Sequence, residues 1–171
     1  MGKKLKAAVI FIILLLADQL TKLWAVKVLK PIGSIPVIRN VLEIYYVENR
    51  GAAFGIMQNK QWFFLIITLA VLAGLIWISG KIPEERHFTP LGICLYFVGA
   101  GAVGNMIDRI FRKYVVDFVY FSLINFPVFN VADIYVTVAA VMLVILILFF
   151  YQEEDFDRIF PKKTKEGRRE L

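Results

Sequence analysis

The sequence contains a single cysteine, Cys94, and a single histidine, His87. One cysteine cannot form an internal disulfide or a cysteine-based metal cluster, and one histidine excludes a histidine dyad and most zinc sites. The zinc-protease pattern HExxH is also absent. We therefore expect no metal and no cofactor.

Charged residues are also few. They make up 20% of the 171 residues, whereas soluble domains have about 25%. Hydrophobic residues reach 59% and the mean hydropathy is +0.68, which a chain of this length cannot hide in a soluble core because small domains expose much of their surface. The composition excludes a soluble enzyme and a disordered chain, and it indicates an integral membrane protein.

The formal net charge is +6, but this surplus does not indicate a nucleic-acid partner. Six of the 20 basic residues lie in the polar tail from Arg158 onward. Basic residues beside membrane spans are normally topology signals. We therefore expect no nucleic acid among the partners of this chain.

Four apolar runs are each long enough to cross a hydrocarbon layer of about 30 Å as a helix. They predict an all-α membrane protein with four transmembrane helices, folded as a single membrane domain over residues 1–171. The spans are expected at about residues 7–26, 62–79, 91–107 and 134–151. The first run is not interpreted as a cleaved signal peptide, because no small-x-small cleavage site follows it.

The lysines before the first span and the dense basic tail predict that both termini are cytoplasmic. The outer segments then cover about residues 27–61 and 108–133, and residues 152–171 form a frayed cytoplasmic tail. Residues 41–47 are rich in β-branched and aromatic side chains. A small β-rich extracytoplasmic segment is therefore expected at the outer membrane surface.

Four of the six aspartates fall at the outer half or the outer edge of the membrane in this topology. They are Asp18, Asp108, Asp117 and Asp133. Ionisable groups are costly to bury in a bilayer, so each of these acids is a candidate for function. Their shared position is the main functional signal that the residues alone provide.

Structural alternatives exist for the first two acids. Asp18 and Lys22 are four residues apart, so they can form an internal ion pair on one helix face, which is compatible with substrate contact. Asn105, Asp108 and Arg109 form a polar helix face in which the acid can pair with the arginine at a snorkelling helix end. A snorkelling helix end would explain the presence of Arg109, but it explains less well why three polar residues share this helix face.

The other two acids also have alternatives. Asp117 lies in an apolar, strand-like stretch, where an unpaired acid has a raised pKa, but it could be a surface loop acid. Asn130 is a good N-cap residue, and Asp133 suits the first turn of the helix that follows. Capping alone does not explain why Asp117 lies on the same side of the membrane.

The run from Gly99 to Gly104 matches the pattern GxGxxG. We reject a dinucleotide site, because no strand precedes the run and no acid follows about 20 residues later. Small residues instead let helix backbones approach closely in lipid.

Two aspartates in a water-poor site suggest acid–base chemistry on a peptide bond. One ionised carboxylate takes a proton from water, and the other, protonated, donates to the carbonyl oxygen. Sharing one proton drives their pKa values apart. A Ser–Lys pair is less suitable, because Ser122 has no lysine at a suggestive spacing beyond Lys113.

Five blocks occur in order along the chain: Asp18-Gln19-Leu20-Thr21-Lys22, Asn49-Arg50-Gly51-Ala52-Ala53-Phe54-Gly55, Gly104-Asn105-Met106-Ile107-Asp108-Arg109, Val116-Asp117-Phe118 and Phe129-Asn130-Val131-Ala132-Asp133. Together they strongly resemble the bacterial lipoprotein signal peptidase family, also called signal peptidase II. The resemblance covers most of the chain, with the same four-span layout.

The resemblance implies a membrane aspartyl endopeptidase, a hydrolase that removes the signal peptide from diacylglyceryl-modified prolipoproteins just before the lipidated cysteine. The family's catalytic dyad falls on Asp117 and Asp133. Its supporting or substrate-binding residues fall on Asp18, Lys22, Asn49, Gly51, Asn105, Asp108, Arg109 and Asn130. An aromatic residue of a segment that closes over the site falls on Phe54.

The resemblance further implies a place in the bacterial cytoplasmic (inner) membrane, in contact with membrane lipid, with the active site at the outer face. It also implies inhibition by the lipopeptide globomycin. Two other functional classes make different predictions. A small transporter or proton-conducting module would need polar residues across the depth of the bilayer, and a structural assembly factor would tolerate loss of the Asp117 carboxylate.

Overall fold

The computed structural model describes residues 2–51, 57, 58 and 60–161. Its longest helices are α1 (Lys3–Trp24), α3 (Gln61–Ser79), α4 (Thr89–Phe111) and α5 (Val131–Phe149). Short helical segments are η1 (Ala25–Leu29, a π-helix), α2 (Lys30–Ile32), η3 (Arg86–Phe88), η4 (Ser122–Ile124) and α6 (Glu153–Ile159). The strands are β1 (Ser34–Ile38), β2 (Leu42–Asn49) and β3 (Val115–Tyr120).

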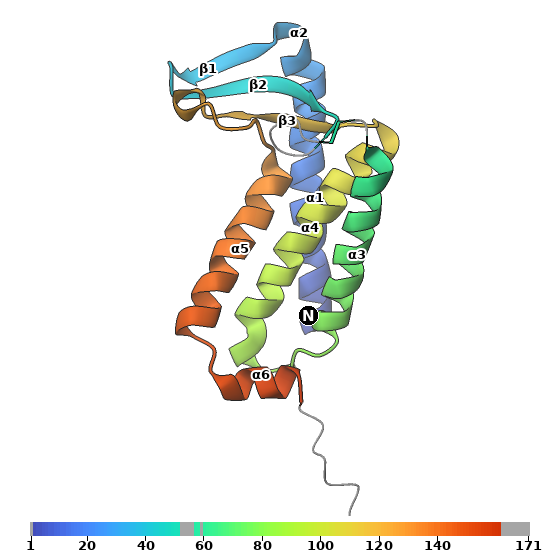
Figure 1. The fold of residues 1–171 in the computed structure, drawn as a ribbon, viewed down its shortest axis with the longest axis vertical. Helices are drawn as coiled ribbons and strands as arrows, with labels where there is room; N and C mark the ends of the chain where they lie inside the picture. Colours follow the sequence, from blue (N-terminus) through green and yellow to red (C-terminus); the bar gives the residue numbers. More distant parts are fainter. Residues whose placement is uncertain (1, 52–56, 59, 162–171) are drawn as a thin grey trace, which may run out of the picture.

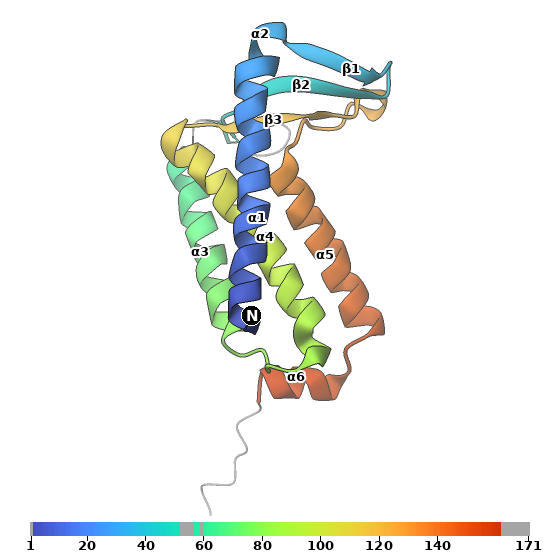
Figure 2. The same ribbon diagram turned by 180° about the vertical axis from the view of Figure 1, so that it is seen from behind.

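Among the described residues, four helical stretches are long and apolar enough to cross a membrane, which confirms the predicted fold class. They cover Leu5–Ile32, Gln61–Ser79, Arg86–Phe111 and Val131–Phe149. The first extends past the expected end near residue 26, because η1 and α2 continue α1 up to the sheet (Figure 2). The fourth begins at Val131 rather than near residue 134, because Asn130 caps it.

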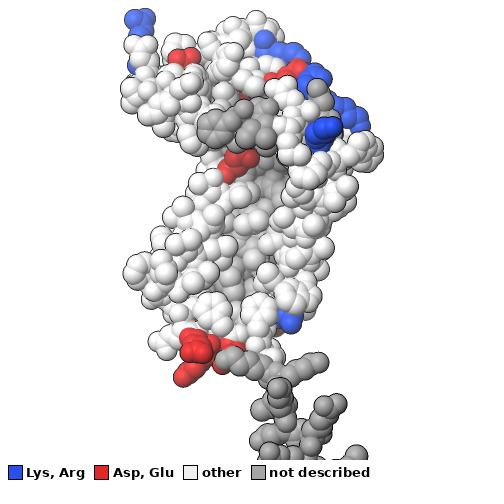
Figure 3. Space-filling model, viewed as in Figure 1, with Lys and Arg blue, Asp and Glu red and all other residues white. Residues whose placement is uncertain are grey.

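The four long helices form a bundle with α4 packed against α1, α3 and α5 (Figure 1). On the face shown in Figure 3, charged side chains gather mainly toward the two ends, and the flank between them is largely uncharged. This distribution suits a bundle that faces lipid along its sides. The N-terminal end of α1 and α6 lie at the same end, opposite the sheet.

The glycines of α4 provide the close packing. A Cβ atom added at Gly99 would lie 3.3 Å from the side chain of Phe11, and one at Gly101 would lie 2.5 Å from the carbonyl oxygen of Ala132. A Cβ at Gly104 would collide with the carboxylate of Asp18. The packing interpretation of this run is confirmed. Residues of α1 and α5 fill the space beside Gly101 and Gly104.

A three-stranded antiparallel sheet in the order β1-β2-β3 covers one end of the bundle. It contains the predicted β-rich segment, and β2 includes most of residues 41–47. Ala25 and Leu29 of η1 are buried against Val116 and Phe118 of β3. Because side chains alternate along a strand, Asp117 between them points to the opposite face of β3.

The other end of the bundle has its own apolar cluster. Phe88, Cys94, Tyr151 and Ile159 are buried there together. Ile159 belongs to α6, so the expectation of a frayed tail is wrong for residues 153–159. Three acidic residues in the first turn of α6 and a capping box at Gln152 favour this helix. His87 and Cys94 lie far from the sheet, as expected.

Candidate active site

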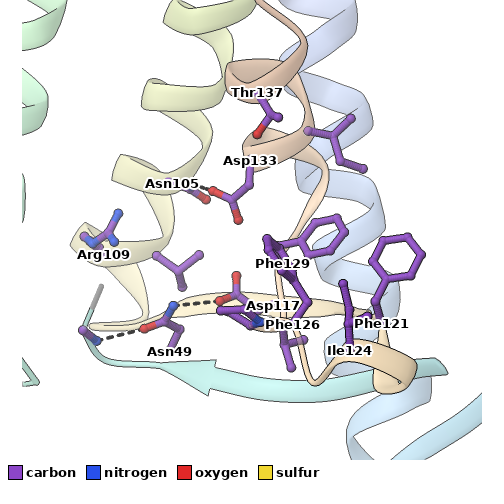
Figure 4. Close-up of a pocket in the computed structure, with 15 residues that line it drawn as sticks. Asn49, Asn105, Arg109, Asp117, Phe121, Ile124, Phe126, Phe129, Asp133 and Thr137 are labelled. Atoms are coloured by element: carbon purple, nitrogen blue, oxygen red, sulfur yellow. Dashed lines mark hydrogen bonds between the residues drawn. The ribbon is translucent and has the colours of Figure 1, made fainter. Parts of the chain in front are cut away.

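A cavity of about 580 Å³ lies where the sheet meets α4 and α5 (Figure 4). Most of its lining is apolar, which matches the water-poor site that the sequence predicted. The residues that line it are Asn49, Gly51, Asn105, Arg109, Val115, Asp117, Phe121, Ile124, Phe126, Pro127, Val128, Phe129, Asp133, Ile134 and Thr137.

Asp117 is buried in the cavity wall on β3 and accepts two hydrogen bonds. Asn49 Nδ2 donates to its Oδ2 at 2.8 Å, and Asn130 Nδ2 donates to its Oδ1 at 2.6 Å. Asn49 reaches it from the end of β2, because the β2–β3 register pairs Asn49 with Val115. Both carboxylate oxygens are therefore held by amides, which excludes the surface-loop alternative for this acid.

Asp133 lies in the first turn of α5, and its carboxylate accepts from two groups. Asn130 backbone N–H donates to Oδ2 at 3.1 Å as one half of a capping box. Asn105 Nδ2 donates to Oδ1 at 2.8 Å. The capping role of Asn130 and Asp133 is thus real, and the same carboxylate also faces the cavity.

Asp117 and Asp133 point toward one another from β3 and α5 (Figure 4). Burial and, to a smaller extent, the charge of Asp133 together raise the pKa of Asp117 to about 7, against the lowering effect of the hydrogen bonds from Asn49 and Asn130. Two facing carboxylates of which one holds a proton near neutral pH can act as a general acid and a general base.

A buried ionic cluster lies behind the cavity, and its members do not line it. Asp18, Lys22 and Asp108 are each fully buried. The ammonium of Lys22 lies 3.0 Å from Asp18 Oδ2 and 3.4 Å from Asp108 Oδ2. The internal ion pair predicted for Asp18 and Lys22 is therefore present, and neither residue is in the cavity lining.

Asp108 pairs with Arg112 and Lys22 rather than with Arg109. The proposed Asp108–Arg109 pair is wrong, because neighbouring residues on a helix do not face each other whereas residues four apart do. Asp108 also accepts a hydrogen bond from the backbone N–H of Val116 at 3.0 Å. This contact ties the end of α4 to the strand that carries Asp117.

Arg109 lies in the cavity wall instead. Its guanidinium carbon is 4.9 Å from the ring centroid of Phe64 on α3. Its buried Nε has no hydrogen-bond partner among the described residues. Asn49 Oδ1 accepts from the backbone N–H of Gly51 at 3.0 Å, which places Gly51 in the wall as well.

Phe54 lies outside the described residues. The sequence interpretation missed Arg112 as the partner of Asp108, although the spacing of four residues was a usable signal. It also missed the aromatic wall of Phe121, Phe126 and Phe129, whose rings stack or pack edge to face. Among the described residues, no three His, Cys, Asp or Glu side chains gather as a metal-binding group.

Comparisons with known proteins point to one family. The family model described as Signal peptidase (SPase) II matches residues 10–149. The chain is 47% identical over 138 residues to the lipoprotein signal peptidase of Caldanaerobacter subterraneus subsp. tengcongensis, covering 80% of this chain and 92% of that protein. It is 42% identical to the lipoprotein signal peptidase of Streptococcus pneumoniae, covering 84% of this chain and 93% of that protein.

Two solved structures have the same fold. One, described as a bacterial membrane enzyme solved by the in meso method at 2.3 Å resolution, matches with a TM-score of 0.75 and 32% identity over 94% of both chains. A second, at 1.9 Å resolution, matches with a TM-score of 0.74 and 33% identity over 85% of this chain and 94% of that one. With a family model over most of its length and close full-length relatives, the chain belongs to the lipoprotein signal peptidase family, also called signal peptidase II.

Proposed function

We propose that the protein is a membrane aspartyl endopeptidase that cleaves diacylglyceryl-modified prolipoproteins just before the lipidated cysteine. Membership of its family makes it a hydrolase that removes signal peptides from lipoproteins. The further assignment to an aspartic mechanism rests on one observation, the facing pair of Asp117 and Asp133 in a largely apolar cavity.

The chemistry follows from the protonation of this pair. The ionised carboxylate takes a proton from a water molecule, which then attacks the scissile carbonyl carbon. The protonated carboxyl group donates its proton to the carbonyl oxygen as the tetrahedral species forms. The two titrations are coupled, so the roles of acid and base belong to the pair. No covalent bond to the protein is required.

The surrounding residues have supporting roles in this proposal. Asn49, Asn105 and Asn130 donate hydrogen bonds to the two carboxylates and fix their orientation. Arg109 and Gly51 line the cavity, and in this proposal they hold the substrate peptide. Asp18, Lys22 and Asp108 support the wall from behind.

The proposed location is the bacterial cytoplasmic (inner) membrane. In this proposal both termini are cytoplasmic, so the sheet and the cavity face the outer side of the membrane. The chain forms a single membrane domain. The lipopeptide globomycin is the proposed inhibitor. Along α3 there is no Asp, Glu, Lys or Arg, and along α5 there is only Asp133, which argues against a proton path across the bilayer.

The test uses the purified full chain in detergent with a prolipoprotein that carries diacylglycerol on its cysteine. The same precursor without lipid is the control substrate. We expect cleavage of the lipidated precursor and poor cleavage of the control, with product masses that place the cut immediately before the modified cysteine. Equal cleavage of both precursors, or a cut elsewhere, would contradict the proposed specificity.

A further inference from the structure

The ammonium of Lys22 has three side-chain oxygen neighbours inside the protein. It lies 2.8 Å from Asn105 Oδ1, 3.0 Å from Asp18 Oδ2 and 3.4 Å from Asp108 Oδ2. An ammonium group has three N–H donors and no acceptor. The side chain is fully buried, so water does not compete for these donors.

The charges around Lys22 are balanced. Asp18 and Asp108 are also fully buried, and Arg112 supplies a second cation to Asp108. Two carboxylates therefore face two cations, as a buried cluster requires. The backbone N–H of Ala132 donates to Asp18 Oδ1 at 3.0 Å, so the cluster also contacts the start of α5.

The contact with Lys22 determines how the Asn105 amide is turned. Because the ammonium can only donate, the oxygen of the Asn105 amide must face it. Asn130 Nδ2 donates to the same oxygen at 3.2 Å. The amide nitrogen of Asn105 then has to point the other way, where it donates to Asp133 Oδ1 at 2.8 Å.

We infer that Lys22 is a positioning residue that acts through Asn105 to keep an N–H donor on the carboxylate of Asp133. This inference rests on the proposed function, in which Asp133 is one of the two reacting carboxyl groups. Lys22 does not line the cavity, so its effect on the reaction passes through the amide. Without Lys22, only the longer hydrogen bond from Asn130 holds the amide oxygen in place. The amide then turns more readily, and a turned amide sets its oxygen against the carboxylate of Asp133.

Loss of the Asn105 N–H donor would weaken mainly the ionised form of the Asp117 and Asp133 pair. A hydrogen bond from an amide N–H stabilises a carboxylate more than a protonated carboxyl group. Losing the donor therefore makes the first ionisation of the pair harder. As the pH is lowered, the variant would therefore lose its ionised base, and with it activity, at a higher pH than the natural protein does.

The experiment compares Lys22→Met with the double variant Asp18→Asn/Lys22→Met. The single variant leaves a buried carboxylate without its cation, so it loses stability as well as activity. The double variant removes one negative and one positive charge, which keeps the cluster neutral. Lys81→Met is the matched control, because Lys81 lies at the opposite end of the bundle, 4.5 Å from the ring centroid of Trp77.

We expect the double variant to recover most of the melting temperature lost in Lys22→Met while kcat stays about 10- to 100-fold low, as for a lost hydrogen bond to a charged group. KM should change little. In a plot of kcat against pH, the fall of kcat on the acid side (the acid limb) should move to higher pH in both Lys22 variants. It should stay in place in Lys81→Met. The limb is read well below the melting temperature, so a poorly folding variant still reports it.

Recovery of kcat in step with stability, with the acid limb unmoved, would show that Lys22 is only structural and would overturn the inference. That outcome leaves the proposed function standing as long as the natural chain cleaves the lipidated precursor. A natural chain that does not cleave it would overturn the proposed function and this inference together.

Discussion

Asn130 holds Asp117 with a hydrogen bond of 2.6 Å from its side-chain nitrogen, and its side-chain oxygen accepts at 3.1 Å from the backbone N–H of Asp133. One amide therefore joins β3 to the first turn of α5. The cap that starts the fourth span also sets the distance between the two acids. The same side chain therefore caps α5 and positions a carboxylate of the site.

Asn130→Ser separates these two roles. Serine keeps an oxygen that can cap α5, but it loses the amide nitrogen that donates to Asp117. We expect a melting temperature close to that of the natural protein and a kcat about 10- to 100-fold lower. Asn130→Ala should lose activity and also about 1 kcal/mol of stability from the missing cap. Equal melting temperatures for both variants would contradict the capping role.

The pH dependence of stability reports the buried carboxyl group of Asp117. Its pKa rises from an ordinary value of 3.8 to about 7 in the folded protein. Between these values the folded state binds more protons than the unfolded state, so stability falls as the pH rises. Asp117→Asn cannot ionise, so its melting temperature relative to the natural protein should increase between about pH 4 and pH 7. Parallel curves would show that Asp117 titrates normally.

Gly101→Ala tests the close contact between α4 and α5. The new Cβ would lie 2.5 Å from the carbonyl oxygen of Ala132 and 2.8 Å from Cγ2 of Val136. Such overpacking costs about 1–3 kcal/mol, and it would also displace the start of α5. Gly74→Ala is the control, since nothing lies within 4 Å of its added Cβ. We expect a lower melting temperature for Gly101→Ala and an unchanged melting temperature for Gly74→Ala.

Chelation tests whether the two acids act without a metal. Among the described residues, no three His, Cys, Asp or Glu side chains come together as a ligand group. The two cavity carboxylates are instead held by amide donors. Cleavage of the lipidated precursor should therefore be unchanged after dialysis against a chelator. A loss that added zinc or magnesium restores would mean that a metal takes part in the reaction.

The sequence predicted the four helices because continuous apolar runs of this length have few other stable states. It also predicted that Asp117 and Asp133 lie at the same side of the membrane, since that follows from counting spans. Their contact could not be derived in this way. It depends on the register between β2 and β3 and on the cap at Asn130, which bring together groups from three elements.

The remaining differences have local causes. The π-helix that carries Ala25 and Leu29 onto β3 has no clear sequence signal, because it arises from packing against the sheet. Asp108 pairs with Arg112 rather than with the adjacent Arg109, because the helix period brings residues four apart onto one face. The short α6 is ordered rather than frayed, because its acidic first turn and the capping box at Gln152 stabilise its N-terminus.

The central claim is that Asp117 and Asp133 together perform the hydrolysis, and the most direct measurement is cleavage of the lipidated prolipoprotein by Asp117→Asn and by Asp133→Asn. Both variants keep the size and shape of the side chain. Binding of the lipidated precursor, or of globomycin, checks that each variant is folded. The account predicts that both variants bind and that neither cleaves; cleavage at the natural rate by either one would contradict it.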